Sequence, residues 1–278
     1  MATTARDIGY TRYEGRRGIL WLRESYAMFA RHRRAWIMLL LAYYATLLLV
    51  QALPWVGAVV APLIKPVLSV SFLAAAWTQE RGGKPAISML LRGFRANLGA
   101  LLPLGFVFVV GISIALTATA LVDGGQLLDA LYGAAPSADD DPDAATRAFV
   151  TTLQSPRVMA AIVFGALCAL PTLLALWWAP ALVVFQDAGP FTALRASIRA
   201  AIGNWRATLR YAIGIVVFGV VIPTSISAML ALVLPPPINA TLAALIVLPY
   251  VAFFVATLHI CDYVSYRDVF HAGEEATQ

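Results

Sequence analysis

Lys65, in the segment APLIKPVL, is the charged side chain placed deepest inside an apolar run. Charge is costly inside a bilayer, so an ionisable group kept there marks a route or a binding site for an ion or a solute. Pro54, Pro62 and Pro66 crowd the same region. If the turn between two membrane helices reaches Pro62, Lys65 lies at the membrane surface and extends its ammonium group to water. We favour this surface placement.

Pro171 is the second candidate for a site inside the membrane, because a proline within a helix frees a carbonyl group and kinks the chain. Pro180, Pro223 and Pro249 also fall within apolar runs. Many transporters build their binding site from helices that are broken at matching positions. Irregular helix packing produces the same kinks, and we favour that explanation. Lys65 and Pro171 are the candidate intramembrane residues.

Arginines and an aromatic residue gather in the segment PFTALRASIRAAIGNWR, where they could bind phosphate groups. Gly189 and Pro190 stop the preceding helix, and we expect Thr192 to cap a new one. In that helix an apolar stripe runs beside the arginines, as in helices that lie at a membrane surface. The stripe comprises Leu194, Ile198, Ile202 and Trp205. Together with two arginines of the 79–97 loop, the candidate lipid contacts are Arg92, Arg95, Arg195, Arg199, Arg206 and Trp205.

Catalytic and metal-binding patterns are weak. The acidic run Asp139–Asp143 lacks the central glycine and final glutamate of a calcium loop. Asp141 before Pro142 instead predicts the start of a short surface helix that ends at Gln154. The histidines and cysteines share no ligand spacing, and no phosphate loop or nucleophile motif occurs. We therefore expect no enzyme, no metal ion and no cofactor.

The elements that hold these residues are membrane helices. Of the 278 residues, 60% are hydrophobic and 13% are charged, and the mean hydropathy is +0.77. The apolar residues form runs of about 20 or more, the length needed to cross a bilayer as a helix. The predicted fold is an all-α, polytopic membrane protein with six spans. They are Trp36–Leu53, Val56–Thr78, Leu98–Val122, Val158–Phe185, Thr208–Leu234 and Ile238–Ile260.

Charge predicts the orientation. On one side, the residues before the first span, the loops 79–97 and 186–207 with Arg210 beside them, and the tail hold 17 of the 20 basic residues. The loop 123–156 on the other side is acidic. Basic loops stay in the cytoplasm, so both termini are predicted there. The predicted parts are a 1–35 segment with an amphipathic helix, a 36–260 membrane domain and a 261–278 tail.

Two stretches of the chain resemble each other. Residues 78–102 align with 185–209 without gaps, and a fainter third copy precedes the first span. Such self-similarity predicts a repeated unit, here an amphipathic interfacial helix followed by a membrane hairpin. Chance likeness between apolar segments is the alternative. The motif residues are Gln79, Glu80 and Asn97 in the first copy and Gln186, Asp187, Pro190 and Asn204 in the second.

These motifs resemble a broad set of uncharacterised bacterial membrane proteins. The set is related to the membrane domain attached to some glycerophosphodiester phosphodiesterases. The resemblance rests on WAPALVVFQD (178–187), on Pro190, on Asn204-Trp205 and on YVSYRDVF (263–270). It implies a multi-pass inner-membrane protein. It implies no catalytic residue, because the phosphodiesterase chemistry belongs to a separate soluble domain that these 278 residues do not contain.

The expected function is therefore that of a non-enzymatic inner-membrane protein with a basic cytoplasmic face. That face would bind anionic headgroups of membrane lipids, a partner protein or a second copy of the chain. The formal charge of +5 is not a sign of nucleic-acid binding, because no soluble module presents it. The alternative is a transporter of small solutes or lipids. A transporter needs a polar crevice near mid-membrane, lined by Lys65 or the Pro171 kink.

Overall fold

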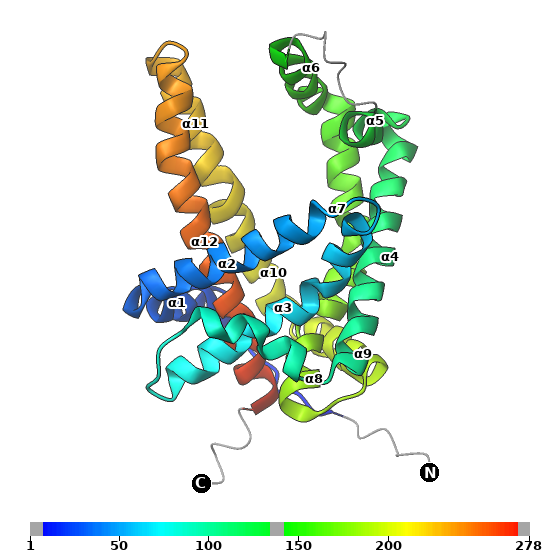
Figure 1. Cartoon of the computed structure of the whole chain (residues 1–278), viewed down its shortest axis with the longest axis vertical. Helices are drawn as coiled ribbons and strands as arrows, with labels where there is room; N and C mark the ends of the chain where they lie inside the picture. Colours follow the sequence, from blue (N-terminus) through cyan, green and yellow to red (C-terminus); the bar gives the residue numbers. More distant parts are fainter. Residues whose placement is uncertain (1–7, 134–141, 272–278) are drawn as a thin grey trace. The chain divides into compact units, whose positions relative to one another are not determined.

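The computed structural model describes residues 8–133 and 142–271, which are helices joined by short connections (Figure 1). Within these ranges, six helical stretches are long and apolar enough to cross a membrane. The predicted all-α fold with six membrane helices is thus confirmed. The stretches are Arg33–Gln51, Gly57–Glu80, Leu98–Asp123, Pro156–Gln186, Trp205–Val233 and Ile238–His271.

Some of these stretches consist of several elements, and shorter helices lie between them. A 3₁₀ helix, η1, precedes α4, and a π-helical turn, η2, joins α10 to α11. In chain order the elements are α1 (Arg16–Arg31), α2 (Arg33–Gln51), α3 (Gly57–Glu80), η1 (Ile87–Arg95), α4 (Leu98–Asp123), α5 (Gln126–Tyr132), α6 (Pro142–Gln154), α7 (Pro156–Trp177), α8 (Ala179–Gln186), α9 (Pro190–Gly203), α10 (Trp205–Val216), η2 (Val217–Val221), α11 (Ile222–Val233) and α12 (Ile238–His271).

The chain divides into two compact units. The second unit, Phe106–Leu174, contains most of α4 and α7 with α5 and α6 between them. Gly165 lets α7 approach α4 closely, since a Cβ there would lie 2.7 Å from the Thr119 side chain. Asp123 caps α5, because its carboxylate accepts from the Leu127 amide at 2.9 Å. The predicted helix α6 has its expected bounds, whereas the acidic residues 139–141 lie outside the described residues.

The first unit, Met1–Gly105 with Ala175–Gln278, has an aromatic core. Trp177 stacks on Trp178 and on Tyr211, with ring centroids 4.2 and 4.9 Å apart. Trp21 of α1 meets all three rings edge-on. The Trp178 ring nitrogen also donates to the Ser265 hydroxyl at 2.9 Å, which satisfies a buried polar group. Residues from α1, the junction of α7 with α8, α10 and α12 are therefore held around one centre.

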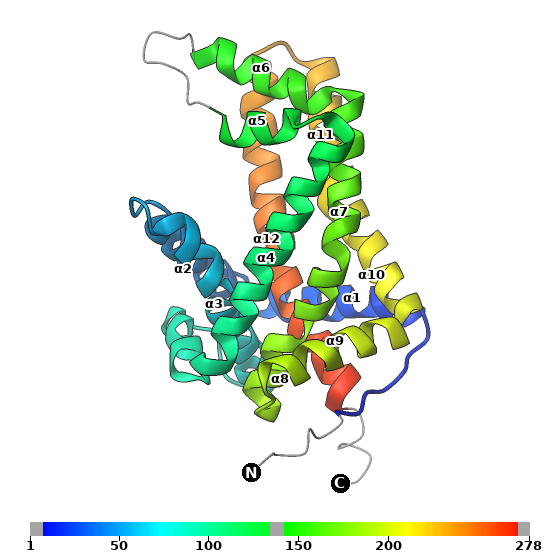
Figure 2. The same ribbon diagram turned by 90° about the vertical axis from the view of Figure 1, so that its right-hand side faces the viewer.

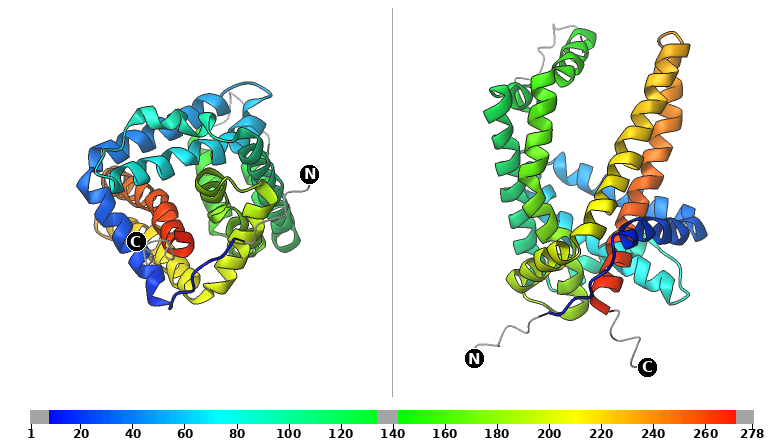
Figure 3. Two further views of the ribbon diagram at one scale, coloured as in Figure 1. Left: turned by 90° about the horizontal axis from the view of Figure 1, so that it is seen from below. Right: turned by 180° about the vertical axis from the view of Figure 1, so that it is seen from behind.

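Helix α12 continues to His271 and does not end at Ile260 as the apolar run suggests. Its last turns are buried, and Figure 3 shows them (red) enclosed by α1, α9 and α3 in the view from below. The segment from Cys261 to Val269 stays helical because its neighbours cover it, although its polar residues end the apolar run. The predicted tail thus begins as part of the folded first unit.

Helix α9 begins at Pro190 with Gly189 as its capping residue, and Thr192 is not the cap that the sequence predicts. Proline suits a first helical position, because its fixed φ fits and the N–H that it lacks would be unpaired there. The exposed fractions of Ile202 and Trp205, two residues of the predicted stripe, are 61% and 57%. Figure 2 shows α9 packed beside α8. The residues of α9 that are buried are small: Ala193, Ala196, Ser197, Ala200 and Ala201.

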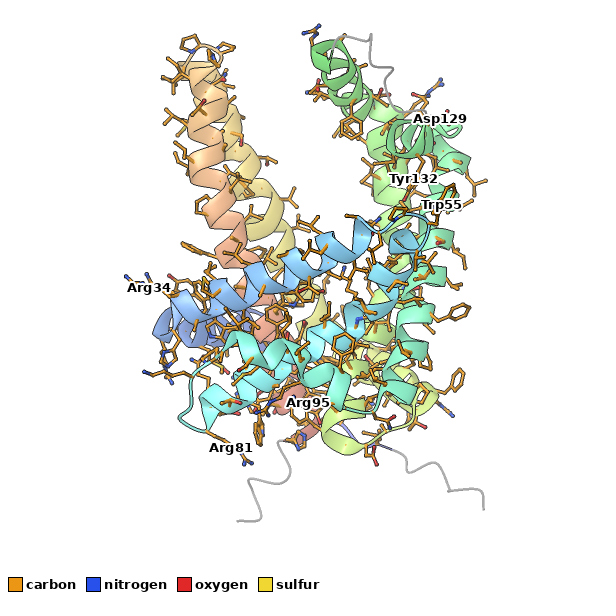
Figure 4. All side chains as sticks on the ribbon, viewed as in Figure 1. Arg34, Trp55, Arg81, Arg95, Asp129 and Tyr132 are labelled. Atoms are coloured by element: carbon orange, nitrogen blue, oxygen red, sulfur yellow. The ribbon has the colours of Figure 1, made fainter. Side chains whose placement is uncertain are left out.

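Lys65 lies within α3, well past its first turn. The helix already begins at Gly57, and the turn that precedes it carries the exposed Trp55 (labelled in Figure 4). Pro62 is inside the helix, so the turn does not reach it and the argument for a surface position of Lys65 does not hold. Pro171 also lies inside a helix, α7 of the second unit.

Candidate functional site

The N-terminal segment is fixed across α12 and the junction of α9 with α10. The Thr11 amide donates to the Val269 carbonyl at 2.8 Å. The buried Asn204 side chain accepts from the Tyr13 amide at 2.7 Å and donates to the Thr11 carbonyl at 3.0 Å. The Asn204 side chain therefore clamps residues 11–13 through one accepted and one donated hydrogen bond, as the backbone of a neighbouring β-strand would. The sequence singles out Asn204 as a motif residue, and the structure provides its role.

This clamp brings the N-terminal arginines against those of α9 and α10. Two adjoining hollows of about 720 and 460 Å³ result, and they share Arg12 and Trp205. We call them together the basic hollow. Glu14 is the carboxylate among the lining residues. The arginines that line the basic hollow are Arg12, Arg16, Arg199, Arg206 and Arg210.

Aromatic rings and a glycine shape the basic hollow. The Arg206 guanidinium lies 5.3 Å from the ring centroid of Trp205, and that of Arg12 lies 6.0 Å from Tyr10. Such contacts orient a guanidinium by its face. The N–H groups at the edge of the guanidinium can then form a bidentate hydrogen bond with a phosphate. A Cβ at Gly15 would lie 3.0 Å from Arg210 Nε, so the glycine makes room for that side chain.

The predicted lipid contacts do not form one site. Arg199, Arg206 and Trp205 line the basic hollow, whereas Arg195 is exposed on α9 and does not. Arg92 and Arg95 are exposed on η1; Figure 4 labels Arg95 there. Sequence reasoning missed three hollow residues, because it treated their charges only as marks of orientation. The signal that could have found them is the polar Asn204 between two helices. The missed residues are Arg12, Arg16 and Arg210.

Glu80 belongs to a different group, which we call the ionic cluster. It accepts hydrogen bonds from Arg267 and from the Tyr263 hydroxyl. Arg267 also pairs with Glu24 at 3.3 Å. Arg17 pairs with the same Glu24 at 2.8 Å and with Asp268, whose hydrogen bond raises the pKa of the Arg17 guanidinium. With three carboxylates to two guanidinium groups, the ionic cluster joins α1, α3 and α12 and is not suited to an anion.

The remaining motif residues have local structural roles. Gln79 accepts from the Trp36 ring nitrogen and donates to the Met28 carbonyl, both at 2.7 Å. Asn97 accepts from the Ala100 amide at 3.2 Å, at the start of α4. Gln186 and Asp187 end α8, with Asp187 exposed in the left-handed region at φ 51°. Because paired positions differ in burial and partners, and η1 differs from α9 in helix type, the repeat stays a prediction.

The intramembrane candidates, Lys65 and Pro171, are not part of the basic hollow. Lys65 lies in the first unit and Pro171 in the second, and neither lines the basic hollow or the apolar cavity beside Ile19 and Phe253. Within the described ranges, no three His, Cys, Asp or Glu side chains lie close enough together to hold a metal ion. Cys168 and Cys261 are free thiols in different units.

Comparison with known proteins supports the placement in a membrane. The chain is 27% identical over 262 residues, or 92% of each chain, to a protein of Burkholderia thailandensis described as a probable inner membrane protein. No family model matches the chain, and no solved structure matches it. Together with the six helical spans, the relative indicates an integral, multi-pass protein of the inner membrane.

Proposed function

We propose that this inner-membrane protein binds the anionic headgroups of phospholipids through the basic hollow and catalyses no reaction. The observation that supports this proposal most is the gathering of five arginines around Trp205, with Glu14 as the carboxylate beside them. Close like charges repel, so a protein keeps such a group for an anionic ligand or surface. Each basic side chain near an anionic membrane surface contributes about 1 kcal/mol of attraction.

The surroundings of the hollow suit a membrane surface more than an aqueous pocket. Ile202 of α9 and Trp205 of α10 line the hollow and are exposed, and Phe191 is exposed at the start of α9. Tryptophan is enriched at the headgroup level, where one edge of the ring is wet and the other contacts acyl chains. If a lipid phosphate binds in the hollow, the acyl chains of that lipid would therefore lie beside these apolar side chains. The likeness to the phosphodiesterase-associated membrane domain adds no catalytic residue.

The proposal places both termini in the cytoplasm, where the leaflet is rich in anionic lipid. We expect a fluorescent protein fused after Gln278 to fluoresce, because this fluorophore matures in the cytoplasm. Alkaline phosphatase inserted into the 134–141 segment should be active, because it folds only outside the cytoplasm. The fusion pair is measured in whole cells, with the two reporters exchanged as the control. If the phosphatase in 134–141 is inactive and the exchanged reporters are both active, the protein has the opposite orientation and the proposal is wrong on this point.

Removing the charge of the hollow should weaken headgroup binding. In a quadruple variant, Arg12, Arg16, Arg206 and Arg210 are each replaced by Gln. We expect its apparent Kd for phosphatidylglycerol in mixed detergent micelles to rise at least tenfold. This estimate assumes that each lost arginine contact contributes about 1 kcal/mol and that screening by solvent reduces the sum. The native preference for phosphatidylglycerol over phosphatidylcholine should shrink with it, as measured by thermophoresis at two salt concentrations.

A second quadruple variant with the same change in net charge is the control. It replaces exposed arginines outside the hollow, and its Kd should rise no more than about threefold through the general loss of charge. Equal losses in both variants would mean that total charge, and not the hollow, attracts the lipid. The control positions are Arg81, Arg92, Arg95 and Arg195, of which Figure 4 labels Arg81 and Arg95.

A further inference from the structure

A third cavity, of about 470 Å³, lies between α1 and the pair formed by η2 and α12. This volume is typical of cavities that bind small molecules. Its walls are apolar, with Ile19 and Leu22 from one side and Phe218, Phe253 and Phe254 from the other. We call it the aromatic groove. It shares no lining residue with the basic hollow.

The π-helical turn η2 forms part of the wall of this groove. Pro223 cannot donate a hydrogen bond and its ring crowds the carbonyl one turn earlier, so the helix widens before it. The Tyr250 hydroxyl donates to the Phe218 carbonyl at 2.6 Å and satisfies it. At Gly219 a Cβ would lie 2.7 Å from the Phe254 ring, so the ring packs directly on the backbone. Single-turn π helices often occur at functional sites.

Arg23 is the charged residue that lines the aromatic groove. It is one turn of α1 beyond Ile19, and its side chain is exposed. Among the described residues it has no ion-pair partner, unlike Arg17 on the same helix. An apolar cavity with one uncompensated guanidinium at its edge is complementary to a molecule with an acyl chain and an anionic head.

We propose that the aromatic groove binds one acyl chain of an anionic phospholipid and that Arg23 binds its phosphate. This goes beyond headgroup contact at the basic hollow, because here a single lipid is a bound ligand of the protein. The ring faces hold the chain by burial of apolar surface, and the guanidinium selects the headgroup. A zwitterionic lipid keeps the chain contacts, but its cationic group partly offsets the attraction to Arg23.

The test uses the full chain in dodecyl maltoside, stripped of lipid and then mixed with equimolar phosphatidylglycerol or phosphatidylcholine of the same chains. Native mass spectrometry counts the lipid that stays bound. We expect one retained phosphatidylglycerol and at least fivefold less phosphatidylcholine. Arg23→Gln should lower phosphatidylglycerol retention to the phosphatidylcholine level. Ile19→Trp, which fills the groove from a half-exposed position, should lower retention of both lipids at least fivefold.

Two neighbours serve as controls. Leu20→Trp places the same ring one residue away, and Arg34→Gln removes a charge at the start of α2 (labelled in Figure 4); both should retain lipid as the native chain does. Unchanged lipid retention in Ile19→Trp would overturn the proposal. So would the finding that the native protein is a dimer which Ile19→Trp dissociates, because a second chain would then occupy the groove. If only the quadruple variant of the basic hollow loses lipid, the groove proposal fails while the proposed function stands. The reverse result supports the groove alone.

Discussion

Asp268→Asn is expected to destabilise the folded protein by about 3–5 kcal/mol, the usual effect of removing one partner of a buried ion pair. The Asp268 carboxylate is 7% exposed and accepts from Arg17 and from the Trp21 ring nitrogen, the latter at 2.9 Å. Asparagine keeps the shape and one acceptor but no charge. Arg17 would then face Glu24 alone while partly buried, so α1 would lose one of its ion pairs with α12.

The measurement is chemical or thermal unfolding in detergent, followed by the near-ultraviolet signal of the aromatic core. Asp129→Asn removes an exposed carboxylate (labelled in Figure 4) and should leave stability unchanged within about 0.5 kcal/mol. Adding Arg17→Met to Asp268→Asn should restore part of the loss, because no buried charge is then left without its partner. If Asp268→Asn unfolds like the native chain, the ionic cluster does not hold α1 in place.

Gly18→Ala is expected to destabilise the first unit by about 3 kcal/mol, at the upper end for one added methyl group in a packed interior. A Cβ at Gly18 would lie 2.0 Å from the Ala207 carbonyl oxygen. That oxygen belongs to the backbone of α10 and cannot turn aside, so the two helices must move apart. The shift would also disturb Trp21 and the stacked rings behind it.

The same unfolding assay tests this prediction. Gly93→Ala should act similarly, because its Cβ would lie 1.8 Å from the Val67 carbonyl oxygen. Gly189→Ala is the control, since nothing lies within 4 Å of a Cβ there and its φ is −64°. A native-like Gly18→Ala would show that α1 and α10 are not in close contact through this residue.

The helical spans could be predicted because the signal is local. Residues of an apolar run decide their environment together, since hydrocarbon requires every backbone polar group to be paired within the helix. The bounds of α6, Pro142 to Gln154, agree with the prediction, because a proline at the first helical position is a signal that depends only on neighbouring residues. The start of α9 lies three residues before the predicted one, because Gly189 and not Thr192 is the capping residue and Pro190 is the first helical residue.

The last turns of α12 and the buried side of α9 could not be predicted from pattern. Cys261 to Val269 is polar enough to leave the membrane, and contacts with α1, α3 and other helices of the first unit bury it. In α9 the apolar stripe was expected at the membrane surface, and no sequence pattern indicated that the small residues form the packing face, where small side chains let helices approach closely. Periodicity shows which residues share a face, and not which face meets a neighbour.

Local sequence patterns suffice to show that this chain is a six-helix membrane protein with most of its basic residues near short helices and turns. The meeting of Arg12 and Arg16 with Arg206 and Arg210, and the neutralisation of Arg17 by Asp268, become visible only in the folded chain. The reason is physical: helix formation in hydrocarbon depends on neighbouring residues. The grouping of charges depends on contacts between residues about 190 or more apart in the chain, such as those of Asn204 and Asp268.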